Sequence, residues 1–340
     1  MLPDTVSVAA DVRGGMVAKG PEVVTCGEAM LLLLAEPGVP LDRAVHFRRS
    51  VAGAESNVAV GLARLGHGVR WLGRVGADPA GEAVLRELRA DCVDVAHAIV
   101  DDHAPTGLLM RDSHAYRAID VQYYRMGSAA SRLTPEQIRP EALEGTQLLH
   151  LSGITPMLSP TAAAASRRLV ELARAAGAKV SFDPNVRHKL GGAAQWAQTA
   201  GPLLRDADIV LAGEEELELL TAQPADEAAR ELLRGGADEV VIKRTDHSST
   251  VLTADGGWDQ SPHAVPVVDP IGAGDGFAAG YLSARLRGLH EDQALAEAAC
   301  VAALVVQAAT DTDGLPTAAA RDRALAELSK GSKGGDAVYR

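Results

Sequence analysis

Short apolar, β-branched runs alternate along the chain with segments in which apolar residues recur every three or four positions. The first pattern predicts buried strands and the second predicts amphipathic helices. Helices are expected at residues 55–65, 81–89 and 161–176, and a glycine follows the first and the third of them, as is common at helix ends. The predicted strands are Val23–Gly27, Val69–Gly76, Leu148–Gly153, Lys179–Asp183, Ile209–Gly213 and Glu239–Arg244.

This alternation predicts an α/β fold with a mostly parallel sheet covered on both faces. Ligands in such folds bind beyond the carboxyl ends of the strands. Two stretches, at about residues 30–50 and 106–126, break the pattern because they are strand-like, interrupted by turns and leave no room for a helix. We expect them to pair into a small sheet that covers the site as a lid.

The composition, with 47% hydrophobic and 23% charged residues among 340, is that of an ordinary globular protein. A net charge of −12 argues against a nucleic-acid or anionic membrane partner, so an anionic substrate would need local arginines. The longest apolar run, Ala298–Val306, falls well short of the roughly 18 residues that a membrane helix needs. Three scattered cysteines favour reduced thiols and a cytoplasmic location over a disulfide framework or a zinc site.

Both ends of the chain are predicted to lie outside the folded domain. Residues 1–20 are polar, contain a second methionine at Met16 and have no signal-peptide hydrophobic region, which indicates a disordered extension or a start assigned too far upstream. The tail at 329–340 is rich in glycine, serine and lysine and is expected to be flexible.

The stretch with the most chemical information runs from Asp269 to Asp275 and leads into a helix of small residues. Gly272 and Gly274 allow a sharp turn and close approach of the backbone to a bulky ligand. The helix that begins there directs its free N–H groups at the same point, which suits phosphate. A carboxylate such as Asp275 would repel a resting phosphate. Its presence favours the interpretation that Asp275 is a general base, which takes the proton of a hydroxyl that attacks phosphorus. The alternative is an ordinary glycine-rich turn with an N-cap aspartate.

Four further motifs, which all precede this turn in the chain, line up with it in order and spacing, at residues 52–57, 73–78, 183–187 and 214–216. Together with the glycine-rich turn they resemble the ribokinase-like (phosphofructokinase-B type) carbohydrate kinases over about residues 22–320. Within that family, residues 123–131 and 150–156 are similar to those of 2-keto-3-deoxygluconate kinases. The resemblance implies a three-layer α/β/α kinase domain, here residues 21–328. It also implies transfer of the γ-phosphoryl group of ATP, with Mg²⁺, to the terminal 6-hydroxyl of the sugar acid.

The resemblance also assigns the catalytic groups. Asp275 matches the family's catalytic base, and the backbone amides of Gly272, Ala273 and Gly274 match its anion hole. Because phosphoryl transfer depends mainly on positioning and charge neutralisation, these groups and Mg²⁺ are sufficient apparatus.

On the substrate side, Arg125 and Arg187 match positions that hold the sugar acid, and a guanidinium group can bind its carboxylate with two hydrogen bonds. The alternative is that both arginines are solvated surface residues. Tyr123 is expected to donate a hydrogen bond to a substrate oxygen from the lid, and the alternative is packing within the lid. Either of the two adjacent tyrosines could face the site, because neighbouring strand residues point to opposite faces. Gly53 and Asn57 match further substrate positions, and Asn57 is equally compatible with a residue at a helix start.

On the nucleotide side, Lys243 lies at the end of the strand that approaches ATP in the family, with a solvated lysine as the alternative. Thr245 follows this strand and could donate its hydroxyl to the nucleotide. Glu216 matches an acidic residue that organises Mg²⁺ through water, and its alternative is a favourable first helical turn. The resemblance leaves open a monovalent cation near Asp269. Gly213 replaces the family's asparagine, which removes one polar side chain from the metal and phosphate network.

Two other departures bear on function. Glycines expected after Lys243 are absent from residues 245–249, which leaves the nucleotide contacts open. Leu32 replaces an aspartate that binds sugar hydroxyls in ribokinases and fructokinases, which favours an acidic sugar. The alternatives are a kinase for 2-keto-3-deoxygalactonate, fructose or ribose, or an inactive sugar-acid-binding protein. Because exposed lid strands often pair with another subunit, a homo-oligomer is expected.

Overall fold

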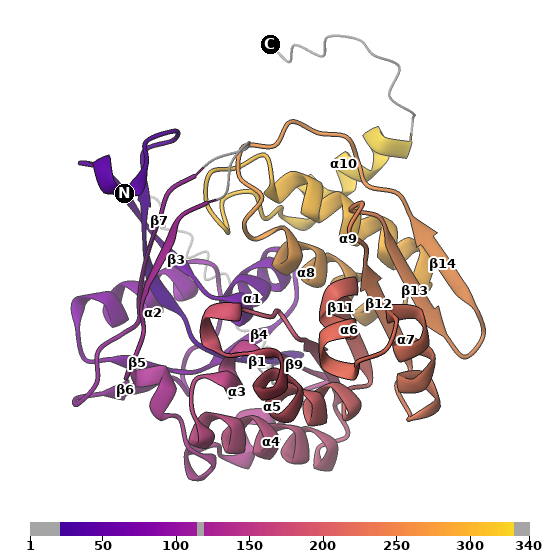
Figure 1. The fold of residues 1–340 in the computed structure, drawn as a ribbon, viewed down its shortest axis with the longest axis horizontal. Helices are drawn as coiled ribbons and strands as arrows, with labels where there is room; N and C mark the ends of the chain where they lie inside the picture. The colour runs from indigo at the N-terminus through magenta and orange to yellow at the C-terminus, as the bar shows by residue number, and fades with distance from the viewer. Residues whose placement is uncertain (1–20, 114–118, 330–340) are drawn as a thin grey trace, which may run out of the picture.

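The computed structural model describes residues 21–113 and 119–329, and its centre is an eight-stranded sheet (Figure 1). From one edge to the other the strands are β14 (Gly257–Gln260), β13 (Ser249–Thr253), β12 (Glu239–Lys243), β11 (Ile209–Gly213), β10 (Lys179–Asp183), β9 (Leu148–Ser152), β1 (Val23–Cys26) and β4 (Val69–Leu72). Pairing is parallel from β4 to β12 and antiparallel at β13 and β14. The mostly parallel sheet predicted from the alternation is confirmed.

Helices cover both faces of this sheet, and each face buries its own apolar cluster. One layer contains α1 (Ala54–Arg64), α2 (Pro79–Ala90), α8 (Ala273–Leu286) and α9 (Glu291–Val305), with α10 (Ala318–Ser329) packed against α9. The other contains α3 (Ile154–Met157), α4 (Pro160–Ala175), α5 (Ala193–Arg205), α6 (Glu214–Thr221) and α7 (Ala225–Arg234). The result is a three-layer α/β/α domain. Within the described part of the chain, no helix is both long and apolar enough to cross a bilayer.

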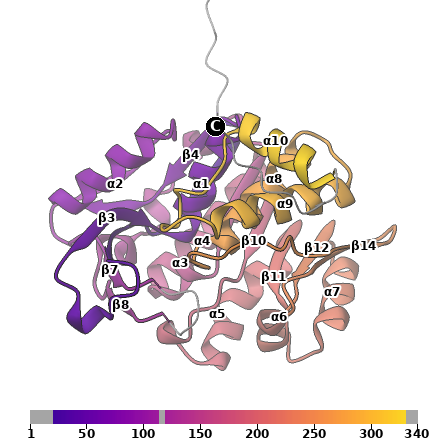
Figure 2. The same cartoon turned by 90° about the horizontal axis from the view of Figure 1, so that it is seen from above.

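A second sheet lies at one end of the molecule, away from β14 (Figures 1 and 2). Its strands are, in order, β3 (Phe47–Ala52), β2 (Met30–Ala35), β7 (Leu108–Arg111) and β8 (Val121–Tyr124). The two stretches expected to pair do so, although a short 3₁₀ turn at Leu41–Arg43 shows that the first of them is not free of helical structure. Leu32 is fully buried in the apolar cluster of this lid sheet. Closure over the site stays a prediction.

The predictions for residues 1–20 and 330–340 lie outside the described residues, as do residues 114–118 of the second lid stretch. Helix α10 continues to Ser329, the first residue of the predicted tail. The single strand predicted at Val69–Gly76 is wrong, because the chain changes partners at Gly73. Strand β4 ends at Leu72, and β5 (Arg74–Gly76) pairs with β6 (Ile99–Asp101) in a separate two-stranded sheet. A Cβ at Gly73 would lie 2.2 Å from the ring of Trp71, so the turn depends on glycine.

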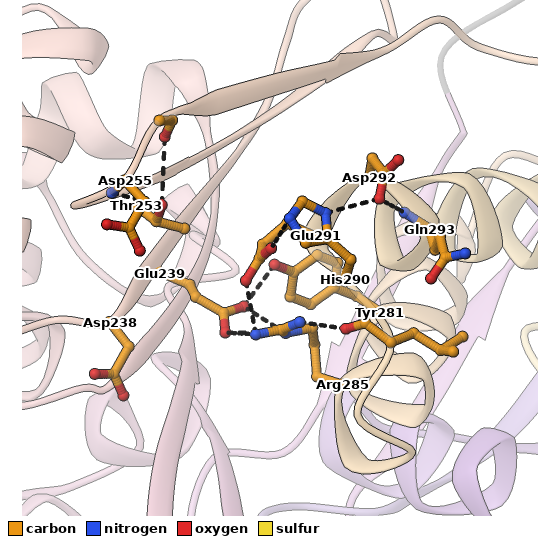
Figure 3. A network of polar contacts seen from close by, with 12 residues as sticks. Asp238, Glu239, Thr253, Asp255, Tyr281, Arg285, His290, Glu291, Asp292 and Gln293 are labelled. Carbon is orange, nitrogen blue, oxygen red and sulfur yellow. Dashed lines mark hydrogen bonds and ion pairs between the residues drawn. The ribbon is translucent and has the colours of Figure 1, made fainter.

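A polar network ties the far end of α8 to the central sheet (Figure 3). Glu239, the buried first residue of β12, accepts a hydrogen bond from the Tyr281 hydroxyl at 2.6 Å and pairs with Arg285 at 2.7 Å. Arg285 also pairs with Glu291 at the start of α9, at 2.8 Å. One guanidinium therefore bridges two carboxylates from different elements, at the end of the sheet opposite the carboxyl ends of the parallel strands.

Candidate active site

A cavity of about 560 Å³ lies between the lid sheet and the carboxyl ends of the parallel strands. This is the position expected for ligands of an open α/β sheet. Three predicted site residues do not line it, namely Ala273, Thr245 and Glu216. Those that do are Gly53, Asn57, Tyr123, Arg125, Arg187, Lys243, Gly272, Gly274 and Asp275.

Asp275 lies in the first turn of α8, directly after the glycine-rich turn. Its Oδ2 accepts a hydrogen bond from Nδ2 of Asn57 at 2.8 Å, and its Oδ1 faces Nδ2 of Asn185 at 3.4 Å. Asn57 belongs to α1 and Asn185 follows β10, so two distant segments orient one carboxylate. Asn57 thus contacts the predicted base directly and is more than a residue at a helix start.

The environment of Asp275 favours its protonated form more than water would. Loss of hydration raises the pKa of this carboxyl from 3.8 to about 7. The hydrogen bond from Asn57 and the charge of Arg187 lower the pKa, whereas the carboxylates of Asp183 and Asp311 raise it. A carboxylate with a pKa near neutrality is suited to accept a proton in a reaction at physiological pH.

The two glycines of the turn have different structural functions. Gly272 has a φ of +87°, and a Cβ there would lie 2.8 Å from the carbonyl oxygen of Asp311, so only glycine fits. A Cβ at Gly274 would find only Nζ of Lys243, at 4.0 Å. In this first helical turn the N–H of Ala273 donates to the carbonyl oxygen of Pro270 at 3.4 Å. The N–H groups that follow have no preceding helical carbonyl to bond, and they carry the positive end of the helix dipole. The open space at Gly274 can therefore accept an anion.

Lys243 supplies a fixed cation next to this space. Its Nζ lies 2.7 Å from Oδ2 of Asp183, the last residue of β10, which is separated from β12 by β11. Although burial by itself would lower the pKa of Lys243, the carboxylates of Asp183 and Glu216 outweigh it and raise the pKa. The ammonium group is therefore charged and paired, which excludes the alternative of a solvated lysine.

Two residues predicted on the nucleotide side are engaged elsewhere. Oε1 of Glu216 accepts a hydrogen bond from the amide of Val186, and Oε2 accepts one from the amide of Gly213, both at 2.7 Å. Glu216 thus caps α6, as the alternative interpretation proposed. The amide and hydroxyl of Thr245 face Glu214 at 3.3 and 3.4 Å. A contact of Thr245 with nucleotide and a metal contact of Glu216 through water stay predictions.

The lid contributes an ion pair that the sequence analysis missed. Tyr123 faces the cavity and Tyr124 is 59% exposed, which settles which of the two tyrosines points inward. The guanidinium of Arg125 lies 5.4 Å from the Tyr123 ring centroid and pairs with Glu28, a buried carboxylate that also accepts a hydrogen bond from the Ser128 hydroxyl at 2.5 Å. Arg125 is therefore a neutralised cation.

Arg187 is the more available of the two arginines. Its Nη1 donates to the backbone carbonyls of Val186 and Asn185 at 3.1 and 3.4 Å, and among the described residues no carboxylate lies within ion-pair distance of it.

Gly53 has a packing requirement of its own, because a Cβ there would lie 2.3 Å from the carbonyl oxygen of Glu28. For Glu28, the only feature of the sequence that could have indicated a residue of the site is its position at the end of the first predicted strand.

Comparisons with known proteins show the family to which this chain is similar. The family model described as "pfkB family carbohydrate kinase" matches residues 21–318. A 2-dehydro-3-deoxygluconokinase of Bacillus subtilis is 38% identical over 300 residues, which cover 87% of this chain and 93% of the relative. A 2-dehydro-3-deoxygalactonokinase of Haloferax volcanii is 31% identical over 83% of this chain and 90% of its own length. The crystal structure of a PfkB protein from Polaromonas sp. JS666 superposes with a TM-score of 0.80 at 36% identity, covering 89% of this chain and 99% of that one.

Proposed function

The chain belongs to the pfkB family of carbohydrate kinases, and we propose that it transfers the γ-phosphoryl group of ATP to the 6-hydroxyl of 2-keto-3-deoxygluconate. The observation that carries this proposal is the placement of Asp275 in the cavity, oriented by Asn57 and bordered by the open anion site at Gly274. An intact base next to an anion site also argues against an inactive sugar-acid-binding protein.

In the proposed reaction Asp275 takes the proton of the 6-hydroxyl as that oxygen attacks the γ-phosphorus. A bond forms between O6 and phosphorus, the bond from phosphorus to the bridging β–γ oxygen breaks, and ADP leaves. The amides of Gly272, Ala273 and Gly274 together with the Lys243 ammonium stabilise the charge on the phosphoryl oxygens. Closure of the lid would exclude water that otherwise hydrolyses ATP.

Mg²⁺ would neutralise phosphate charge when bound with ATP. Within the described residues no group of three histidine, cysteine or acidic side chains is arranged to hold a metal. This donor set fits Mg²⁺ only as an ion that takes most of its ligands from phosphate and water. Both oxygens of Glu216 accept backbone hydrogen bonds, so its contribution would be the proposed contact through water.

The sugar-acid carboxylate is assigned mainly to Arg187, because Arg125 is already paired with Glu28. Arg125 and Tyr123 would then contact substrate oxygens from the lid. The likeness to the Haloferax volcanii relative supports one alternative substrate, 2-keto-3-deoxygalactonate. The two sugar acids differ at one hydroxyl, and both would use the same cation for the carboxylate.

We also propose a homo-oligomer that forms through the lid strands, a cytoplasmic location, and a monovalent cation near Asp269. The Asp269 carboxylate already pairs with Arg111 at 2.5 Å, so a cation bound to this carboxylate would compete with that ion pair.

The direct test is ADP release with Mg²⁺-ATP against 2-keto-3-deoxygluconate, 2-keto-3-deoxygalactonate, fructose and ribose in parallel. Turnover on a 2-keto-3-deoxy sugar acid and not on the neutral sugars would support the assignment of Arg187. The ratio of the two sugar acids identifies the preferred epimer. Turnover only on a neutral sugar would refute the sugar-acid proposal, and binding of a sugar acid without any turnover would indicate the inactive binding protein.

A further inference from the structure

Arg111 connects the lid sheet to the catalytic turn through two buried carboxylates. It is the last residue of β7, and its side chain is 1% exposed. Nη1 lies 2.5 Å from Oδ2 of Asp269, and Nη2 lies 2.8 Å from Oδ1 of Asp311. Asp269 begins the glycine-rich turn, whereas Asp311 belongs to the segment that follows α9. One planar guanidinium thus joins three segments that are distant in the sequence.

Both carboxylates contact the turn that presents the anion site. Oδ1 of Asp269 accepts a hydrogen bond from the amide of Ile271 at 2.9 Å, which holds the chain just before Gly272. The backbone of Asp311 packs on the other side, since its carbonyl oxygen lies 2.8 Å from the position of a Cβ at Gly272. The conformation of Gly272 therefore depends on the positions of the two aspartates.

We propose that Arg111 is a positioning residue that holds the anion-binding turn from the lid sheet, so that the phosphoryl site has its active geometry only with this bridge in place. The inference rests on the proposed function for its catalytic consequence. Two buried carboxylates this close to one cation repel each other when the cation is removed, and both would then move or take up protons. Either response shifts Ile271 and Gly272, and with them the amides of the first turn of α8.

The competing explanation is an ion pair that stabilises the fold and has no effect on the turn. Arg285 provides a matched control, because it also bridges two carboxylates, Glu239 and Glu291, and lies on α8 ten residues after Asp275 (Figure 3). A purely structural arginine should behave like Arg285. A positioning residue should also change the turn.

The experiment compares wild type with Arg111→Met, Arg111→Lys and Arg285→Met by hydrogen–deuterium exchange and steady-state kinetics on whichever sugar the wild type phosphorylates. Arg111→Met should raise amide exchange at residues 270–276. It should lower kcat about 100-fold, as expected for a displacement of about 1 Å, with the KM for the sugar changed by less than about threefold. Arg285→Met should lower thermal stability while exchange at 270–276 and kcat stay near wild type. Arg111→Lys keeps the charge but not the planar fork, so kcat should stay about tenfold below wild type.

The inference is overturned if a folded Arg111→Met protein has wild-type exchange at 270–276 and wild-type kcat. If Arg111→Met does not fold, Arg111→Lys decides, and wild-type values for it would equally overturn the inference. The exchange measurement needs no turnover. A wild-type protein that phosphorylates no sugar would therefore refute the proposed function, and the exchange comparison alone would still support or overturn the bridge.

Discussion

Replacing Asp275 with asparagine tests both the chemistry and the physical basis of the site. Asparagine has nearly the same shape and can still pair with Asn57, but it cannot take a proton from the sugar hydroxyl. Loss of a general base typically lowers the rate by about 10² to 10⁴, so kcat should fall by that amount. Substrate binding should change little, because Arg187, Arg125 and the lid are untouched.

The same substitution should stabilise the fold, because Asp275 is a carboxylate held in an unfavourable place. A pKa raised from 3.8 to about 7 disfavours the folded anion by about 4 kcal/mol as an upper limit. Asp275 is partly exposed to the open cavity, and solvent screening reduces this to about 1–2 kcal/mol. The unfolded chain loses its proton near pH 4 and the folded protein near pH 7. Wild type therefore loses stability as the pH rises between these values, and the loss is complete above pH 7.

Thermal unfolding at pH 5 and pH 8, combined with initial-rate kinetics at pH 8, checks both parts. The Tm of Asp275→Asn should exceed that of wild type by about 2–4 °C at pH 8 and by less at pH 5. Wild type should also show kcat/KM that rises through a pKa near 7. A variant that turns over at a near wild-type rate would exclude Asp275 as the base. A lower Tm at pH 8 would refute the argument that the folded site disfavours the anion.

Three further substitutions separate the functions of neighbouring positions. Gly274→Ala places a methyl group in open space near Lys243, so the free energy of unfolding should stay equal or rise by about 0.5 kcal/mol. The KM for ATP should rise, because the methyl group occupies the space proposed for the phosphates. An unchanged KM for ATP would place the phosphates elsewhere. Arg125→Met leaves the buried Glu28 without its cation and should cost about 3 kcal/mol in denaturant unfolding. A cost well under 1 kcal/mol would mean that the pair is not formed. Arg187→Ala breaks only bonds to backbone carbonyls, so its Tm should be near wild type while the KM for the sugar acid rises at least about tenfold. Normal affinity would remove Arg187 from the carboxylate site.

The sequence by itself determined the features that depend on local periodicity and turn chemistry. Buried parallel strands and amphipathic helices have different repeats, so the alternation was enough to predict the central sheet. Gly272, Gly274 and Asp275 were recognisable because a sharp turn, a helix start and a carboxylate occur within a few residues of one another.

Only the tertiary structure decided which charged groups meet. Arg125 was expected to hold the sugar acid, and the lid pairs it with Glu28. Glu216 was expected to organise Mg²⁺ through water, and both of its oxygens accept backbone hydrogen bonds at the start of α6. Arg111 attracted no attention in the sequence, yet it forms ion pairs with both Asp269 and Asp311. Spacing along the chain specifies the direction of a side chain within its own element. Ion pairs between elements depend on how the strands and the lid pack, and in a low-dielectric interior that packing decides whether a charge is available for a ligand.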